Sequence, residues 1–408
     1  MARIAIFTSD YPYGTGEQFV DTEISIAAEL GHDIVIWPLK AEGRRRELPP
    51  GVTVSLGLAE LWNPRTFITA AAKTPLDRAV RKEALGLLSS KRLKSHGNIL
   101  AIKSIQKKAI ERSFIKLEPE LRTFDVLYSY WAGLIPIGFA ALGNHWNFAS
   151  RVSRGHGSDI YQYAVHKQFA PFRAESWERL DRMYLISEHG LNYVQKISDI
   201  QDTRLALARL GTKVKHLEDA IDYQQEEVAI LSIGNAVELK RLGVAVGACA
   251  RLAEMLAPKP VTWVHIGSGP LEERILQACR SAKSRVDNFD FKMMGQIEHS
   301  EILEMLTRER FALLLSASSS EGIPVSQMEA MERGIPVVST MVGGVTELID
   351  GTDSIGVRED ASKDEIAQAM EQLLRNGAPG NIGRDRIVEK YDLRENITNF
   401  YNELGLLR

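Results

Sequence analysis

The sequence predicts an α/β protein with two parallel-sheet domains, and three observations lead to this prediction. The chain has 408 residues, enough for two domains that each bury a core. Short, wholly apolar runs typical of buried strands recur along it and alternate with helical patterns. A polar, charge-rich stretch over 213–227 interrupts this alternation and is typical of an interdomain linker. We therefore expect domains over 1–212 and 228–390, followed by a final segment over 391–408.

The composition indicates a globular protein in a reducing compartment. Hydrophobic residues make up 44% of the chain and charged residues 25%, with a formal net charge of −3. Cys249 and Cys279 are too few for a disulfide framework or a cysteine metal site. The first residues turn polar too quickly for a signal peptide, and no apolar run approaches the ~20 residues that span a bilayer. We expect a cytoplasmic protein.

The N-terminal half opens with a strand, a helix and a second strand. Residues 3–7 and 33–37 are apolar runs, and a helical pattern closed by Gly31 lies between them. The loop after the first strand contains Gly14 and Gly16 but lacks the G-x-G-x-x-G pattern, which disfavours a nicotinamide enzyme. Further strands of this half are expected at 125–130, 148–153, 182–186 and 204–210.

A strongly basic segment over 64–116 interrupts the first half. It carries 13 lysines and arginines against three acidic residues. Ile102, Ile105 and Ala109 fall on one helical stripe, whereas Lys103 and Lys107 fall on another. Such a surface could rest on anionic lipid or accept a lipid diphosphate, and a solvated helical face is an equal alternative. Nucleic acid is disfavoured because no recognition motif or aromatic interleaving accompanies the charge.

The histidine in RGHGSDIY, residues 154–161, is a candidate for function. His156 lies between two glycines, so a ligand or another part of the chain can approach its backbone from either side, and Asp159 follows in the same loop. A lone histidine is more often structural, so the residues alone favour that reading.

Two adjacent cations, Lys240 and Arg241, precede a helical pattern that reaches about Leu256. Positive charge at a helix N-terminus opposes the helix dipole. A bound anion would remove this conflict, whereas a solvated surface pair is the alternative.

The most informative stretch runs over 318–350. Before it, 311–315 is a run typical of a strand buried on both faces. A polar loop, a helix over 325–333 capped by Gly334 and a strand over 335–338 follow. The loop therefore lies at the carboxyl end of a parallel strand, where open sheets bind ligands.

Two glutamates belong to this unit. Glu321 lies in the loop and Glu329 about two turns further along, a separation suited to the two ends of an extended ligand. Taken alone, the pair would also fit a charge at a helix N-terminus and a solvated helix residue. A diphosphate would fit the free N–H groups at this helix start, around Pro324, which are those of Gly322, Ile323 and Val325.

The strings EGIPVSQMEAM and RGHGSDIY, with the later GIPVV and GG, closely resemble retaining glycosyltransferases of family four and their E-x7-E signature. Within that family they look like the branch that builds bacterial exopolysaccharide, capsule and lipopolysaccharide sugars. The resemblance implies the GT-B architecture, two facing Rossmann-like domains with residues 391–408 forming a helix that crosses back to the N-domain. It implies transfer of a sugar from a nucleotide-diphosphate donor to a glycan or a polyprenyl-diphosphate-linked glycan. No D-x-D motif is evident, so we expect neither a metal nor another cofactor.

The resemblance also implies roles for the acidic residues and the histidine. Glu329 would bind the ribose hydroxyls of the donor, and Glu321 would contact the donor sugar. His156 would contact the same sugar from the other domain. Asp159 and Glu17 are the candidates for binding the acceptor.

For the diphosphate, the resemblance points to the cationic pair. Lys240 would neutralise the departing diphosphate, with Arg241 beside it. Asn235 stands where many relatives carry an arginine, so Arg241 could substitute for that phosphate contact. In the N-terminal loop, the backbone at Gly16 would approach the donor phosphates. A non-catalytic partner of the same fold and a nucleotide-sugar epimerase are the alternatives.

Overall fold

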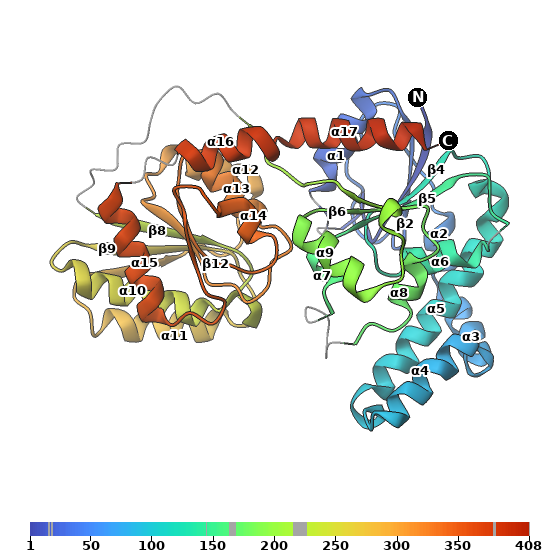
Figure 1. Cartoon of the computed structure of the whole chain (residues 1–408), viewed down its shortest axis with the longest axis horizontal. Coiled ribbons are helices and arrows are strands. Elements are labelled where there is room, and N and C mark those ends of the chain that lie inside the picture. The colour runs from blue at the N-terminus through green and yellow to red at the C-terminus, as the bar shows by residue number, and fades with distance from the viewer. Residues whose placement is uncertain are drawn as a thin grey trace. The chain divides into compact units, whose positions relative to one another are not determined.

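The computed structural model describes residues 1–14, 17, 19–143, 145–162, 169–214, 227–377 and 381–407. The chain divides into an N-terminal unit, Met1–Ala208 with Ile397–Arg408, and a C-terminal unit, Arg209–Asn396 (Figure 1). The linker expected over 213–227 lies almost wholly outside the described residues. Two Rossmann-like parallel-sheet domains were expected, and this fold is confirmed.

The sheet of the N-terminal unit has seven parallel strands in the order β3-β2-β1-β4-β5-β6-β7. The strand order reverses between β1 and β4, which makes the carboxyl ends of these two strands the topological switch point. The strands expected in this half are all present, and β3 is an additional one. Their bounds are β1 (Arg3–Thr8), β2 (Asp33–Pro38), β3 (Thr53–Val54), β4 (Val126–Ser129), β5 (Ser150–Gly155), β6 (Arg182–Leu185) and β7 (Leu205–Leu207).

Helices connect these strands. Apolar side chains of β1, β2 and β4 pack with α5 in one buried cluster that includes Phe7, Trp37 and Phe114. The helix α9 begins after Ser187, whose hydroxyl accepts a hydrogen bond from the Gly190 N–H, as its N-cap position predicts. The helices are α1 (Val20–Glu29), α2 (Gly57–Leu61), α3 (Pro64–Lys73), η1 (Thr74–Leu76), α4 (Arg78–Ser89), α5 (Leu93–Leu121), α6 (Ile135–Ala141), α7 (Gly157–Ile160), α8 (Arg173–Trp177), α9 (Glu188–Ile197) and η4 (Asp202–Arg204).

The two stripes noted on the basic segment do not separate a buried side of α5 from an exposed one. Ile102 of the apolar stripe is exposed, and Lys107 of the basic stripe is buried. The physical reason is local pairing, because Asp77 and Glu111 neutralise Lys107 and allow it to point inward. The buried side of α5 instead passes through Leu100, Ser104 and Lys107.

The sheet of the C-terminal unit repeats the same topology with six parallel strands in the order β10-β9-β8-β11-β12-β13. Its switch point lies between β8 and β11. Gly334 follows α13 with a φ of 74°, the left-handed conformation expected there. The strands are β8 (Val228–Ile233), β9 (Val261–Ile266), β10 (Phe289–Met293), β11 (Leu313–Ser316), β12 (Val337–Thr340) and β13 (Ile355–Val357). The helices are η5 (Glu238–Lys240), α10 (Leu242–Leu256), α11 (Glu272–Lys283), α12 (His299–Arg308), α13 (Val325–Glu332), α14 (Val345–Ile349), α15 (Lys363–Asn376), α16 (Asn381–Lys390) and α17 (Leu393–Leu406).

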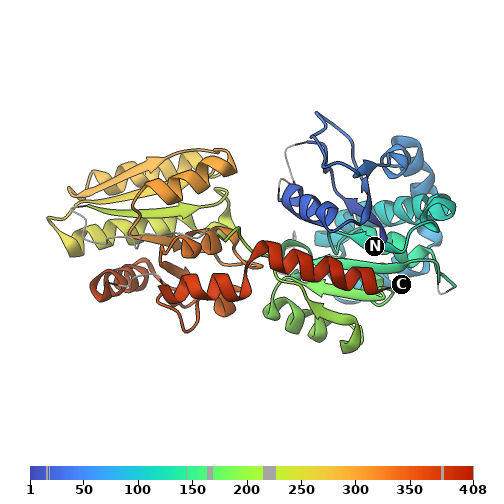
Figure 2. The same cartoon turned by 90° about the horizontal axis from the view of Figure 1, so that it is seen from above.

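The terminal helix α17 returns to the N-terminal unit, as expected (Figures 1 and 2). Its anchor is a buried polar cluster around Glu23 of α1. The Glu23 carboxylate accepts hydrogen bonds from the hydroxyls of Tyr128 and Tyr401, both at 3.2 Å, and pairs with Arg154 at 2.9 Å. Because Tyr401 belongs to α17, this cluster ties the end of the chain to the first sheet. None of the helices among the described residues is long and apolar enough to cross a membrane.

Candidate functional site

The candidate site of the C-terminal unit is built from loops at the carboxyl ends of β8, β9, β11 and β12. These loops touch one another closely. A Cβ atom on Gly343 would lie 1.8 Å from the carbonyl oxygen of Glu321, and one on Gly267 would lie 2.1 Å from that of Gly234. Both glycines also have positive φ angles, so a side chain at either position would both clash with the neighbouring loop and strain the backbone. The sequence therefore brings glycine backbone together at the switch point, where parallel sheets of this kind form a binding crevice outside the carboxyl ends of their strands.

An ion pair spans this switch point. The Lys240 ammonium, at the end of η5 after β8, donates to a Glu321 carboxylate oxygen at 2.6 Å from the loop after β11. The Ser319 N–H donates to the Leu239 carbonyl at 2.8 Å and holds the two loops together. The side chains remain 27% exposed for Lys240 and 12% exposed for Glu321. The structure thus brings together two of the residues expected at the donor, and solvent reaches both.

Unused backbone donors lie beside this pair. The N–H groups of Gly322, Ile323 and Val325 donate to no other described residue, whereas the Gly322 carbonyl accepts from the Gly344 N–H at 2.8 Å. Pro324 is the N-cap of α13 and has an extended backbone. The start of α13 therefore offers donors to an anion, in the place where the sequence predicts them.

The second glutamate lies on α13 and has a partner that the sequence analysis did not identify. A carboxylate oxygen of Glu329 lies 2.6 Å from the His299 ring Nε2 at the start of α12. The hydrogen bond to Glu329 raises the pKa of His299 above its usual value. The Glu329 side chain is 6% exposed, whereas that of His299 is 59% exposed. His299 therefore covers Glu329 from the solvent side.

Arg241 and Asn235 lie in the loop between β8 and α10. The Arg241 guanidinium donates to the backbone carbonyls of Glu359 and Ala361, the latter at 3.0 Å, and the residue itself is left-handed with a φ of 47°. Asn235 is exposed. In this structure Arg241 therefore holds the loop after β13, and its predicted phosphate contact stays a prediction.

In the N-terminal unit, Glu17 lies at the switch point between β1 and β4. Its carboxylate accepts the N–H groups of Ser9, Asp10 and Tyr11 at 2.8–3.0 Å and the indole N–H of Trp131. Although burial opposes ionisation, these donors lower the pKa of Glu17 below its usual value. Glu17 therefore holds the loop after β1 in place. Gly16, expected beside the donor phosphates, lies outside the described residues.

His156 is buried between two aromatic rings. It stacks on Tyr130 with ring centroids 5.0 Å apart, and Trp131 packs against it at 4.7 Å. Burial, with a contribution from nearby Arg154, lowers the pKa of His156 well below its usual value, so the imidazole is neutral. Neither ring nitrogen forms a hydrogen bond with another described residue. His156 is thus a neutral hydrogen-bonding group with unused capacity.

Asp159 orders the loop that contains His156. Its carboxylate accepts the N–H of His156 at 2.7 Å and that of Ala132 at 2.6 Å. Burial raises the pKa of Asp159 to about 7. The residue also lines a mostly apolar hollow of about 480 Å³, together with Leu134 and Phe172 among others.

The described residues contain no group of three or more histidine, cysteine, aspartate or glutamate side chains arranged to hold a metal ion. The titratable residues of the C-terminal site occur as two separate pairs, Lys240 with Glu321 and Glu329 with His299. In each pair, a residue can exchange its hydrogen bond to the other residue for one to a polar ligand.

Comparison with known proteins finds a family model that is similar to part of the second half of the chain. Residues 227–376 match the family model described as "Glycosyl transferases group 1". The putative colanic acid biosynthesis glycosyltransferase WcaL of Escherichia coli is 27% identical over 60% of this chain and 61% of its own length. The amylovoran biosynthesis glycosyltransferase AmsK of Erwinia amylovora is 32% identical over 55% of this chain and 54% of its own length. The matched part of the chain thus spans about half to three-fifths of the length of each of these relatives.

The fold has relatives among solved structures. The lipopolysaccharide outer core galactosyltransferase WaaB, solved in its apo form, superposes with a TM-score of 0.67 at 14% identity and 99% coverage of both chains. This likeness concerns the fold. Residues 227–376 are therefore similar to the glycosyl transferases group 1 family, and the chain has the GT-B fold.

Proposed function

We propose that this protein is a retaining glycosyltransferase of cell-surface polysaccharide biosynthesis. It would move a sugar from a nucleotide-diphosphate donor to a hydroxyl of a glycan or of a polyprenyl-diphosphate-linked glycan. The observation that carries this proposal is the Lys240–Glu321 pair at the switch point of the second sheet, 2.6 Å apart and open to solvent. The polysaccharide context rests on the names of the matched relatives.

The leaving diphosphate is the main difficulty of this reaction, because negative charge develops on it as the glycosidic bond breaks. A donor diphosphate in the crevice would compete with Glu321 for the Lys240 ammonium. The N–H groups of Gly322, Ile323 and Val325 would bind the same oxygens without a metal. Glu321, released from Lys240, would then be free to accept a hydrogen bond from a hydroxyl of the donor sugar.

The nucleoside would lie toward the other end of α13. Glu329 lies about one turn into α13, which begins at Val325, and its carboxylate accepts hydrogen bonds well, so it is proposed to bind the ribose hydroxyls. His299 is proposed to position this carboxylate through the 2.6 Å hydrogen bond. A bound ribose would either share the Glu329 carboxylate with His299 or displace the His299 ring toward solvent.

For the acceptor, we propose the hollow that Asp159 lines in the N-terminal unit. Its apolar walls suit a sugar face or a lipid chain, and Asp159 supplies a carboxyl with a pKa of about 7 that can donate or accept. His156 is proposed to hydrogen-bond a sugar as a neutral imidazole, because its ring nitrogens have no partner among the described residues.

A thermal-shift screen tests the donor site. The protein would be titrated with UDP, GDP, ADP, TDP and their common sugar conjugates, with and without EDTA. We expect one nucleotide at about 100 times its Kd to raise the Tm by roughly 5 °C or more, with EDTA making no difference. The Lys240→Met variant should lose most of that shift, and Lys259→Met, at an exposed lysine of the same unit, should keep it.

The result that overturns the proposal is no shift with any nucleotide, or an equal shift in Lys240→Met. Consumption of donor with no acceptor present, together with a changed sugar configuration, would instead indicate the epimerase alternative.

A further inference from the structure

The helical lobe, defined here as α3, η1, α4 and the first part of α5 over residues 64–108, extends away from the sheet of the N-terminal unit (Figure 1). Ile99, Ile102 and Lys103 of the lobe line the hollow beside Asp159, whereas α3, η1 and α4 take no part in the candidate sites described above. The charge and the exposed apolar side chains of these elements therefore need a separate explanation.

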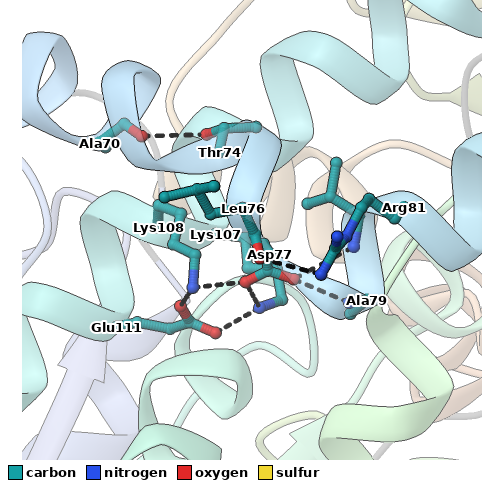
Figure 3. A network of polar contacts seen from close by, with 10 residues as sticks. Ala70, Thr74, Leu76, Asp77, Ala79, Arg81, Lys107, Lys108 and Glu111 are labelled. Atoms are coloured by element: carbon teal, nitrogen blue, oxygen red, sulfur yellow. Dashed lines mark hydrogen bonds and ion pairs between the residues drawn. The ribbon is translucent and has the colours of Figure 1, made fainter.

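Asp77 of the lobe and Glu111 of the adjoining part of α5 are engaged by lysines of α5 (Figure 3). Asp77 caps α4, accepting the N–H groups of Ala79 at 2.9 Å and Val80 at 3.1 Å, and it also binds the ammonium groups of Lys107 and Lys108. Glu111 binds both lysines as well. Although burial opposes ionisation, the hydrogen bonds from Lys108 and Lys107 hold the pKa of Asp77 well below its usual range. The cluster ties α4 to α5 and leaves neither acid to neutralise the surface.

The outer surface of the lobe keeps its positive charge. Nine cations are exposed there, and none forms an ion pair with another described residue. Glu83 is the remaining acid in this range, and it is half-buried. The exposed cations are Arg65, Lys73, Arg78, Arg81, Lys82, Lys91, Arg92, Lys94 and Lys103.

Large apolar side chains are exposed among these cations. On α4, Arg78, Lys82, Leu85 and Leu88 follow helical spacing, so they share one face, on which the cations lie in the first turns and the leucines in the last. Leu85 is 66% exposed and Leu88 55%. The other exposed apolar side chains of the lobe are Ile68, Leu76, Leu93 and Ile102.

We propose that the helical lobe docks on the surface of an anionic lipid bilayer. Its cations would meet the lipid headgroups while Leu85, Leu88 and their neighbours enter the boundary with the acyl chains. Nucleic acid or an acidic protein would satisfy the charge but would leave the leucines in water. An apolar protein partner would bury cations that have no counter-charge in the lobe, which is costly.

Vesicle flotation of the full-length chain tests this proposal. The vesicles would hold phosphatidylcholine with or without about 30% phosphatidylglycerol, and neither donor nor acceptor would be present, so the result does not depend on the proposed transferase activity. We expect binding to the anionic vesicles alone, weakened by added salt because charges near the surface are screened. Arg78→Glu with Lys82→Glu should weaken binding by at least about tenfold.

Two further double variants separate the contributions. Leu85→Ser with Leu88→Ser should abolish the binding that survives high salt. Because both leucines are exposed, this double variant should keep the Tm of the wild-type chain. Lys259→Glu with Arg280→Glu, at exposed cations of the C-terminal unit, changes the net charge equally and should leave vesicle binding intact.

Several outcomes would overturn the proposal. These are no binding of the wild-type chain to anionic vesicles, equal binding to neutral vesicles, or equal weakening by the control pair. If the chain self-associates in solution and Leu85→Ser with Leu88→Ser removes this association, the surface binds a second copy of the chain instead. If the chain bound duplex DNA as tightly as anionic vesicles, with the same salt sensitivity and unchanged by the leucine substitutions, the surface of the lobe would be a general site for polyanions.

Discussion

The two units have the same strand order around their switch points, yet they fill the two crevices differently. At the N-terminal switch point Glu17 accepts four hydrogen bonds from its own loop and from Trp131, and His156 is packed between aromatic rings. At the C-terminal switch point Lys240 and Glu321 have one another, remain partly exposed and adjoin unused N–H groups. Topology thus places a crevice in each unit, and the side chains decide what it can bind.

This difference has a chemical meaning. A carboxylate whose oxygens are all engaged by backbone donors holds a loop, and a ligand must break several bonds to reach it. A lysine with one carboxylate partner can exchange that partner for a phosphate at little cost, because a charge-assisted bond replaces another of the same kind. The C-terminal crevice is therefore suited to an exchangeable anion, whereas Glu17 in the N-terminal one is already committed to its own loop.

The largest expected effect concerns the C-terminal pair. Lys240→Met should lower kcat by about 10²–10³ because it removes a positive charge from the leaving diphosphate in the transition state. Glu321→Gln should lower turnover strongly with a smaller loss of nucleotide affinity. Steady-state kinetics with donor and acceptor measure both effects, and circular dichroism should show unchanged folding. Wild-type turnover in both variants would mean that the pair has no catalytic role.

The next effect concerns the N-terminal crevice. Glu17→Gln replaces one carboxylate oxygen, which accepts N–H groups, with an NH₂ group, which cannot accept them. At least one N–H donor therefore loses its hydrogen-bond partner. We expect the free energy of unfolding to fall by about 2–4 kcal/mol, measured by urea denaturation. Nucleotide affinity, measured by calorimetry on the folded variant, should stay unchanged.

The pH dependence sharpens this test. Because the folded-state pKa of Glu17 lies below its ordinary value of 4.5, the stability from this carboxylate is complete above about pH 4.5 and is lost as the pH falls through the folded-state pKa. Glu17→Gln should remove that part of the acid sensitivity. A loss of nucleotide affinity without a loss of stability would reverse the roles assigned to the two crevices.

Much of the fold could be predicted from local pattern. The apolar runs identify the strands, and the position of Gly334 after α13 predicts its left-handed conformation because the helix must end there. The strand order, and with it the meeting of Lys240 and Glu321, depends on contacts between residues 81 positions apart. Sequence analysis could place each of these residues at the end of a strand, but their direct ion pair requires that β8 and β11 be neighbours.

The errors share one cause, which is pairing between distant residues. A lysine is expected at the surface, and Lys107 is buried because Asp77, 30 positions away, caps α4 next to it. His299 escaped notice for the same reason, since nothing near it in the sequence points to Glu329, which is also 30 positions away. Buried charges of this kind become visible only when the partner's position is known.

The smallest expected effect concerns His299. The folded-state pKa of His299 lies above 6.5, so the stability from its pairing with Glu329 is complete below about pH 6.5 and is lost as the pH rises through the folded-state pKa. Because the histidine is largely exposed, we expect a contribution below about 1 kcal/mol. Thermal unfolding from pH 5.5 to 8.5 should show this loss in the wild-type chain and not in His299→Gln. If His299 positions the ribose ligand, His299→Gln should also weaken nucleotide binding, by less than Glu329→Gln does, and an unchanged affinity would leave His299 with a role in stability alone.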